Sequence, residues 1–245
     1  LVESHIDKFN LSYSNRSDEY HGLSIAGPNS RKVLEKIVRD DVSNEKFKFR
    51  DSRRMFVGGV PAIINRISFT GELGYEIYVA PHYQLKLYEE LMEAGKEFNI
   101  KPFGGRALMS MRLEKNWGAW TLDYRPDFTA KETGLDAFIN WDKEFIGKES
   151  AQKENSSNKL VPLIVETNEI DVTNNEAVLN GDQSIGYVTS GGFAHFVNKS
   201  VAFTFVDQKK IKSENKIQVE INGDLFNCSI IKEPLYDPSG QKMRS

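Results

Sequence analysis

The chain has 245 residues, long enough for two domains, and its 39% hydrophobic, 27% charged and 11% aromatic residues are typical of globular proteins. Its 32 basic and 35 acidic residues give a net charge of −3, which argues against nucleic acid or an anionic membrane as the main partner. The single cysteine, Cys228, excludes an internal disulfide, and with only four scattered histidines the chain lacks an ordinary zinc site, so no metal is expected.

The predicted elements begin with strands over Leu1–Ile6 and Phe9–Tyr13, with Asp7 in the turn before the second strand. No signal-peptide pattern opens the chain, and no apolar run approaches the ~20 residues that span a bilayer, so no membrane partner is expected. A short strand is predicted over residues 22–26. A helix then opens at Gly27-Pro28-Asn29-Ser30 and runs to about residue 38.

The middle of the chain predicts a hairpin followed by helices. Residues 47–67 read as extended, with Gly58-Gly59 as a turn, and residues 63–69 and 75–79 form the arms of a hairpin. Helices are predicted over residues 83–98 and 105–115 from their apolar spacing. Because these elements lack a regular βαβ rhythm, the expected fold class is α+β.

A polar stretch, Gln152–Asn158, marks the predicted domain boundary, which divides the chain into residues 1–154 and 155–245. The second domain shows short strands between Gly and Asn turns, which predicts a small β-barrel or sandwich. The expected strands are Leu160–Glu166, Ala177–Leu179, Ser184–Thr189, Val201–Val206, Gln218–Ile221 and Phe226–Ile231.

Two charged residues stand out as candidates for chemistry. Strand alternation places Glu76 and Tyr78 on the face opposite Tyr75, Ile77 and Val79. Glu76 therefore either faces solvent or pairs with a structural arginine, or it awaits a ligand rich in N–H donors such as a pterin. Arg112 shares a helix face with Leu108, which is equally consistent with packing and with function.

Common motifs are missing from the sequence, which contains no GxGxxG, GxxxxGK[ST], GxSxG or HExxH. The glycine pairs at 104–105 and 191–192 read as turn glycines. The histidines show no metal-like pairing, although His195 lies in a Gly-rich turn between predicted barrel strands.

Six segments in order resemble the aminomethyltransferase (glycine-cleavage T-protein) family, over nearly the whole chain. The resemblance is strongest to the C-terminal half of dimethylglycine and sarcosine dehydrogenases and oxidases. The segments are LSIAGPNSRKVL, ISFTGELGYEIYV, GGRALMSMRLEKNWGAW, DKEFIGKESA, IGYVTSGGFAHFVNKSVAFTFV and EPLYDPSG.

The resemblance implies an α+β folate-binding domain, here partial, followed by a C-terminal β-barrel domain. It also implies that tetrahydrofolate accepts a one-carbon unit to give 5,10-methylenetetrahydrofolate. In the dehydrogenase branch the unit comes from an N-methylated glycine derivative, which FAD in a preceding domain oxidises to an iminium species. That flavin domain is absent from this sequence.

The resemblance assigns the folate site residue by residue. Glu76 matches the glutamate that contacts the pterin, and Arg112 matches the arginine of the RLE motif. Phe69 stands where the family has a tyrosine, which removes a hydroxyl from the site. Tyr236 approaches the folate from the barrel domain. The chain begins with Leu1, so we expect a fragment whose catalytic aspartate, the base that manages the proton at the folate nitrogen, lies upstream.

The sequence therefore predicts the folate-binding portion of a flavin-dependent dimethylglycine- or sarcosine-type dehydrogenase. Two alternatives stay open: a glycine-cleavage T-protein, and a non-catalytic regulatory relative of the family. The full-length protein is expected to be an enzyme, whereas the fragment alone is left undecided. The expected compartment is the bacterial cytoplasm or the mitochondrial matrix.

Overall fold

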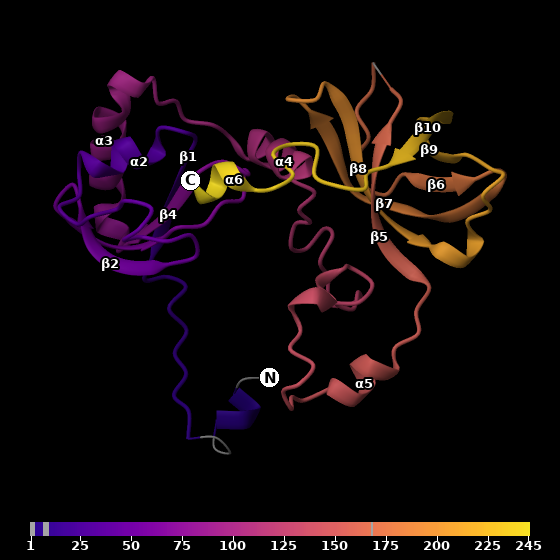
Figure 1. Ribbon diagram of the computed structural model, residues 1–245, viewed down its shortest axis with the longest axis horizontal. Coiled ribbons are helices and arrows are strands. Elements are labelled where there is room, and N and C mark those ends of the chain that lie inside the picture. Colours follow the sequence, from indigo (N-terminus) through magenta and orange to yellow (C-terminus); the bar gives the residue numbers. More distant parts are fainter. Residues whose placement is uncertain (1–2, 7–9, 168) are drawn as a thin grey trace. The chain divides into compact units, whose positions relative to one another are not determined.

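The structure is a computed structural model that describes residues 3–6, 10–167 and 169–245. The chain forms two compact units (Figure 1). Unit 1 comprises residues 1–68, 72–102 and 241–245, and unit 2 comprises residues 69–71 and 103–240. The predicted α+β fold with a C-terminal barrel is confirmed, whereas the boundary between residues 154 and 155 stays a prediction.

Unit 1 is built on an antiparallel sheet of four strands in the order β1-β4-β3-β2. Strands β2 and β3 join through Gly58 and Gly59, whose φ angles of 56° and 79° form the left-handed two-residue turn that suits a hairpin. The strands are β1 (His21–Ala26), β2 (Ser52–Val57), β3 (Val60–Asn65) and β4 (Gly74–Val79).

Helices α2 (Ser30–Glu35) and α3 (Gln84–Gly95) lie together on one face of this sheet (Figure 1). Their buried side chains form one core with the inward residues of the strands. Helix α3 follows Pro81 in a short 3₁₀ turn and continues into another, Lys96–Phe98, which ends at left-handed Asn99. The core therefore covers one sheet face only, and its main members are Ile25, Val33, Leu34, Ile64, Tyr75, Ile77, Leu87 and Leu91.

The first segment of the chain corrects the prediction. Residues Glu3–His5 form a 3₁₀ turn instead of part of a strand, and residues 11–13 have no regular structure, although Leu11 and Tyr13 are exposed. The described residues of this segment pair with no strand, and an alternating apolar pattern forms a strand only where a neighbouring strand is present. The predicted turn residue Asp7, with Leu1, Val2 and Phe9, lies outside the described residues.

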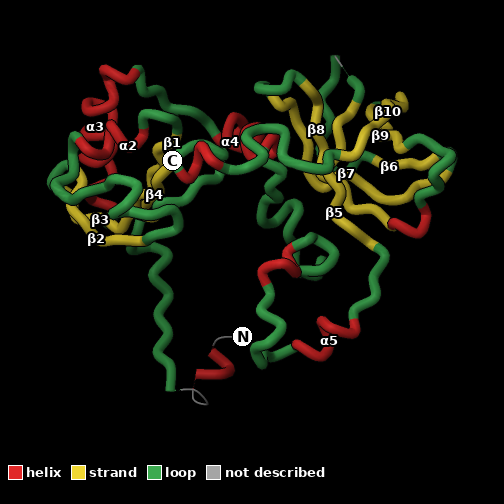
Figure 2. Tube along the Cα trace, in the orientation of Figure 1, coloured by secondary structure: helices red, strands yellow, loops and turns green. Residues whose placement is uncertain are grey.

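Unit 2 contains helix α4 (Gly105–Glu114), a mostly irregular stretch that includes a 3₁₀ turn at Leu135–Phe138, helix α5 (Lys148–Lys153) and a closed barrel (Figure 2). The barrel order is β10-β5-β8-β7-β6-β9. All six predicted strands are present, as β5 (Asn158–Val165), β6 (Ala177–Asn180), β7 (Gln183–Ala194), β8 (Lys199–Asp207), β9 (Ile217–Ile221) and β10 (Asp224–Ile230).

The barrel interior is filled by aliphatic side chains of β5 to β9, such as Leu163, Val178 and Val219, and Phe226 and Cys228 of β10 pack against them. Helix α4 packs against β7 and β8, where Leu113 joins a second cluster with Val201 and Phe203. The glycine pair 191–192 lies inside strand β7 and not in a turn, because β7 is longer than predicted. A last helix, α6 (Gln241–Arg244), belongs to unit 1. Among the described residues, no helix has the length and apolarity to cross a membrane.

Candidate functional site

The face of the unit 1 sheet opposite helices α2 and α3 carries a polar row. Strand register places Ser24 of β1 and Asn65 of β3 on either side of Glu76 in β4. Directly paired strand residues point to the same face, so a hydroxyl, a carboxylate and a carboxamide lie side by side. Tyr78 lies two residues further along β4 on this face, as strand alternation predicts.

The Glu76 carboxylate is half-buried, and it accepts a hydrogen bond from the Tyr78 hydroxyl, with 2.5 Å between the two oxygens. This bond, reinforced by burial, raises the pKa of Tyr78 to about 12. Within the described part of the chain, no ion pair involves Glu76. No described arginine therefore pairs with Glu76, as its interpretation as the partner of a structural arginine would require. Its second carboxylate oxygen, which has no bond to a described residue, is available to a hydrogen-bond donor.

Arg112 lies at the end of α4 in unit 2, with 1% of its surface exposed. Its Nη1 donates to a carboxylate oxygen of Asp123 at 2.7 Å and to the Trp117 carbonyl at 3.0 Å. Burial lowers the pKa of the Arg112 guanidinium, and the neighbouring Asp123 carboxylate opposes that shift. Nε of Arg112 is buried without a hydrogen-bond partner.

Asp123 is the residue that sequence reasoning missed at this place. It is fully buried, and besides Arg112 it accepts from the Ala119 amide at 2.8 Å and from the Thr189 and Ser190 hydroxyls. The four donors come from α4, from the loop after it and from β7. A single acid eleven positions after Arg112 in an irregular loop shows no periodicity, so no signal in the sequence marks it.

Phe69 also belongs to unit 2, where its ring stacks on Trp117 with 6.5 Å between ring centroids. The Lys115 ammonium lies 5.8 Å from the centroid of the Trp117 ring, and it donates to the Asp237 carbonyl at 2.6 Å. The side chain of Lys115 is 2% exposed. Phe69 thus sits in an aromatic and cationic cluster of unit 2.

Tyr236 is buried in the segment that follows strand β10, and its amide donates to the Glu114 carbonyl at 2.9 Å. Its ring meets the exposed Phe196 ring edge-on, with 4.7 Å between centroids. Glu114 also accepts from the Phe196 amide at 2.6 Å. Of the four predicted folate residues, Phe69, Arg112 and Tyr236 lie in unit 2 and Glu76 lies in unit 1.

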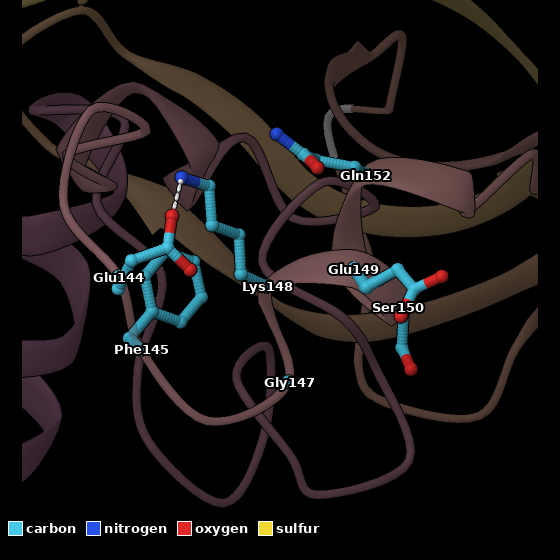
Figure 3. Close-up of a pocket in the computed structure, with 7 residues that line it drawn as sticks. All are labelled: Glu144, Phe145, Gly147, Lys148, Glu149, Ser150 and Gln152. Atoms are coloured by element: carbon cyan, nitrogen blue, oxygen red, sulfur yellow. Dashed lines mark hydrogen bonds and ion pairs between the residues drawn. The ribbon is translucent and has the colours of Figure 1, made fainter.

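An open pocket of about 530 Å³ lies around helix α5 in unit 2 (Figure 3). Its lining is polar, and Lys148 and Glu144 form an ion pair at 2.7 Å across it. The two charges neutralise each other at the surface, where ion pairs contribute little to the free energy of folding. None of the predicted site residues lines this pocket.

The remaining nucleophiles and metal-ligand types give no second centre. Burial raises the pKa of the Cys228 thiol to about 12, so the thiol stays protonated at neutral pH. His195 lies in the turn after β7, as predicted, with its ring against Phe193. Among residues 3–6, 10–167 and 169–245, no group of His, Cys, Asp and Glu is placed to hold a metal ion.

Comparisons with known proteins agree with this architecture. The family model "GCVT N-terminal domain" matches residues 1–143, and "Glycine cleavage T-protein C-terminal barrel domain" matches residues 158–237. The chain is 35% identical to mouse mitochondrial dimethylglycine dehydrogenase over 93% of its own length and 27% of that protein. It is 30% identical to an aminomethyltransferase of Thermoanaerobacter pseudethanolicus over 96% of its length and 64% of that protein.

A solved structure shares the fold. The crystal structure of glycine cleavage system aminomethyltransferase T from Bartonella henselae superposes with a TM-score of 0.77 at 22% identity, covering 89% of this chain and 60% of that one. The chain thus spans about a quarter of the dehydrogenase and under two thirds of the aminomethyltransferase. With its first 143 residues and its barrel both matched, the chain belongs to the glycine-cleavage T-protein family.

Proposed function

We propose that this chain is the tetrahydrofolate-binding, one-carbon-accepting part of a flavin-dependent dimethylglycine- or sarcosine-type dehydrogenase, which forms 5,10-methylenetetrahydrofolate from an iminium intermediate. The likeness to dimethylglycine dehydrogenase over 93% of the chain supports this branch. The observation that carries folate binding is the Glu76 carboxylate, which lies on the open sheet face and has a neutral hydroxyl as its hydrogen-bond partner.

A carboxylate in this setting suits the pterin edge of a folate, which offers neighbouring N–H donors. Two such donors satisfy the two oxygens of one carboxylate in parallel, and bonds of this charge-assisted kind are about twice as strong as neutral ones. Ser24 and Asn65 flank Glu76 in the strand register and add a hydroxyl and a carboxamide, which both donate and accept. These residues fit tetrahydrofolate, and they would bind and orient its pterin.

The other predicted contacts, Phe69, Arg112 and Tyr236, stay predictions from the resemblance. The Arg112 guanidinium already donates hydrogen bonds to the Asp123 carboxylate and the Trp117 carbonyl, so we propose that Arg112 positions the loop of residues 117–123. Phe69 offers a ring face but no hydroxyl. Tyr236 is fixed through its amide on α4.

The chemistry needs an oxidation and a transfer. When bound to another domain, FAD would supply the oxidation that removes hydride from the N-methyl group of an N-methylated glycine and leaves an iminium carbon. A folate nitrogen attacks that carbon, a base takes up the proton that the nitrogen loses, and ring closure on the second nitrogen releases the demethylated amine. We propose that an aspartate upstream of Leu1 is the base. The chain's own part is to hold the folate while this occurs.

A glycine-cleavage aminomethyltransferase is the second candidate, because aminomethyltransferases of 30–34% identity align over 92–96% of the chain. A non-catalytic relative is the third candidate, and Phe69 in place of a tyrosine supports it. Supplying the full-length protein with either dimethylglycine or an aminomethylated lipoyl carrier separates the dehydrogenase from the aminomethyltransferase. If the protein turns over neither substrate, that result supports the non-catalytic relative. The proposed compartment is the bacterial cytoplasm or the mitochondrial matrix.

Glu76→Gln tests folate binding, because it keeps the side-chain volume but removes the charge and replaces an acceptor with a donor. Each lost charge-assisted bond is worth about 1.5–3 kcal/mol, so the Kd for tetrahydrofolate should rise about 10–100-fold. The measurement is calorimetric titration of tetrahydrofolate into the natural full-length protein. Glu89→Gln, on the exposed surface of α3, is the matched control. Equal affinities together with a clear drop in melting temperature for Glu76→Gln would show a structural glutamate.

A further inference from the structure

The polar row on the open face of the unit 1 sheet is not symmetric about Glu76. The register places Ser24 of β1 on one side of it and Asn65 of β3 on the other. Directly paired residues have Cβ atoms about 4.5–5.5 Å apart, so both flanks lie within reach of a group bound at Glu76. Ser24 is exposed, whereas Asn65 is half-buried like Glu76 itself. The two flanks therefore offer a ligand different surroundings.

The Tyr78 ring occupies the flank on the β1 side. Gly22 lies opposite Tyr78 in β1, and a Cβ at Gly22 would approach the Tyr78 ring to 3.1 Å. From this position the Tyr78 hydroxyl donates to Oε2 of Glu76 at 2.5 Å. The ring therefore covers the β1 side of the carboxylate, and a ligand reaches Oε1 from the β3 side.

The flank on the β3 side combines an apolar side chain with a free carboxamide. Ile63 lies opposite Tyr78 and Asn65 lies opposite Glu76, and both are half-buried. The Asn65 carboxamide forms no hydrogen bond with a described residue, and it can turn either its amino group or its oxygen towards a ligand. When a flat ring covers this flank, the carboxamide needs a partner on that ring, because burying an unbonded polar group is costly.

We propose, on the basis of the folate binding proposed above, that Asn65 is a specificity-determining residue of this site and that its Nδ2 donates to the 4-oxo oxygen of the pterin. One edge of a pterin presents the 2-amino group, then N3–H, then the 4-oxo oxygen. When Glu76 takes the two donors, the oxygen comes next along the row and meets Asn65. The site therefore selects a pterin over a 2,4-diaminopteridine, in which an amino group replaces the oxygen and N3 carries no hydrogen.

This selection follows from what each side chain can donate or accept. The ionised Glu76 carboxylate only accepts, so it needs hydrogens on both the 2-amino group and N3, and Oε2 keeps a lone pair for one of them beside its bond to Tyr78. With the diamino compound, one Glu76 oxygen would face the lone pair of N3, and Asn65 would have to turn its own oxygen towards the new amino group. Sites that hydrogen-bond their ligand reject such mismatches strongly, because buried polar groups are left unpaired.

Asn65→Asp tests the contact, because it keeps the shape of the side chain and replaces the donating amino group with an acceptor. Calorimetric titration into the natural full-length protein measures the Kd of tetrahydrofolate and of its 4-amino analogue. We expect the Kd for tetrahydrofolate to rise about 10–100-fold, because one hydrogen bond is lost and two acceptors then face each other. The Kd for the analogue should stay unchanged or fall, because its amino group can donate to the new carboxylate.

Ser52→Asp is the matched control for the added charge. Ser52 lies opposite Asn65 in β2, so this substitution places the same charge in the same row but one strand further from Glu76. It should leave the ratio of the two Kd values unchanged. Equal loss of affinity for both ligands in Asn65→Asp would overturn the proposal. The same change of ratio in Ser52→Asp and Asn65→Asp would also overturn it, because the charge and not the contact would then be responsible.

Infrared spectroscopy of bound tetrahydrofolate, with an isotope label at the 4-oxo carbon, gives a second readout that serves if Asn65→Asp does not fold. Asn65→Leu keeps the side-chain volume and removes the donor, so the carbonyl stretch should move to higher frequency than in the unsubstituted protein. An unchanged carbonyl stretch would contradict the contact.

Glu76→Gln separates this contact from folate binding itself. If Glu76→Gln weakens tetrahydrofolate while Asn65→Asp leaves the ratio of the two Kd values unchanged, the assignment of Asn65 is wrong and folate binding stands. If the unsubstituted protein binds neither ligand, both the folate site and the role of Asn65 are wrong.

Discussion

At the scale of single residues, Tyr78 orients the Glu76 carboxylate, which we propose contacts the pterin. The Tyr78 hydroxyl uses one oxygen of Glu76 and limits the rotation of the carboxylate, while Gly22 lies opposite Tyr78 in β1. A Cβ at Gly22 would approach the Tyr78 ring to 3.1 Å, so the small residue lets the ring lie against β1. We infer that Tyr78 positions Glu76 for its ligand.

Tyr78→Phe should lower the free energy of unfolding by about 1 kcal/mol at pH 8, because it removes one hydrogen bond. The pKa of Tyr78 is raised to about 12 in the folded protein, against about 10 in the unfolded chain. The bond therefore contributes fully below pH ~10, and its contribution falls as the pH rises towards 12. Urea unfolding at pH 8 and pH 11 measures this, with the exposed Tyr88→Phe as control. A difference that is the same at both pH values would contradict the assignment.

The ion pair of Arg112 and Asp123 is a different kind of residue-scale feature, because both partners are buried. Asp123→Ala leaves the Arg112 charge without its counter-ion and strands the donors of Ala119, Thr189 and Ser190. We expect a loss of about 3–5 kcal/mol in the free energy of unfolding.

Urea unfolding measures this loss, and Asp127→Ala is the control. Asp127 pairs with Arg125 at 2.7 Å on the surface, where 61% of its side chain is exposed. The control should therefore lose at most about 1 kcal/mol. Equal losses for the two substitutions would show that the buried bonds of Asp123 stabilise the fold no more than a surface ion pair does.

At the scale of elements, strand β7 contains a bulge and a close approach to β8. The register shifts between Val188 and Ser190, which marks a bulge, and Gly186 faces Val206 of β8. A Cβ at Gly186 would lie 2.0 Å from the Phe205 carbonyl oxygen, so any side chain would push the two strands apart.

Gly186→Ala should therefore lower the stability of the barrel by about 1–3 kcal/mol, the usual cost of overpacking. Gly192→Ala in the same strand is the matched control, because its Cβ would meet only the Leu113 Cδ1 at 3.6 Å. Hydrogen exchange of the β7 and β8 amides compares the two variants. Equal protection in both would mean that the strands adjust without cost.

At the scale of the whole molecule, neither unit is one continuous stretch of the chain. Residues 69–71 join unit 2 although they lie between β3 and β4, and the tail returns to unit 1. Residues 154–156, on the predicted linker, are held by the segment before it. Thr129 donates to Glu154 at 2.6 Å, Lys131 donates to the Glu154 carbonyl at 2.8 Å, and Ser156 donates to Glu132 at 2.5 Å.

Limited trypsin digestion should nevertheless cut first in the polar segment 152–158, because Lys153 is exposed and precedes a stretch without secondary structure. Thr129→Ala removes a hydroxyl that binds Glu154, so it should speed that cut. Mass spectrometry of the first fragments provides the measurement. First cuts within α3 or β8 would show that the predicted boundary is wrong.

Local patterns alone determined much of this protein. The alternation in ISFTGELGYEIYV determined that Glu76 and Tyr78 share a face, and the glycine pair 58–59 determined a tight turn. Regular spacing also gave helices α3 and α4 and all six barrel strands, since each such element depends on residues that are near one another in the chain.

Only the tertiary structure decided the pairings between distant residues. The partner of Arg112 is a loop aspartate, and the partners of Arg31 and Arg66 lie 214 and 179 residues away at Ser245. The first segment reads as a strand but forms none, because a strand needs a neighbour that local sequence does not reveal. Such contacts depend on how the chain closes on itself, and neither periodicity nor spacing carries that information.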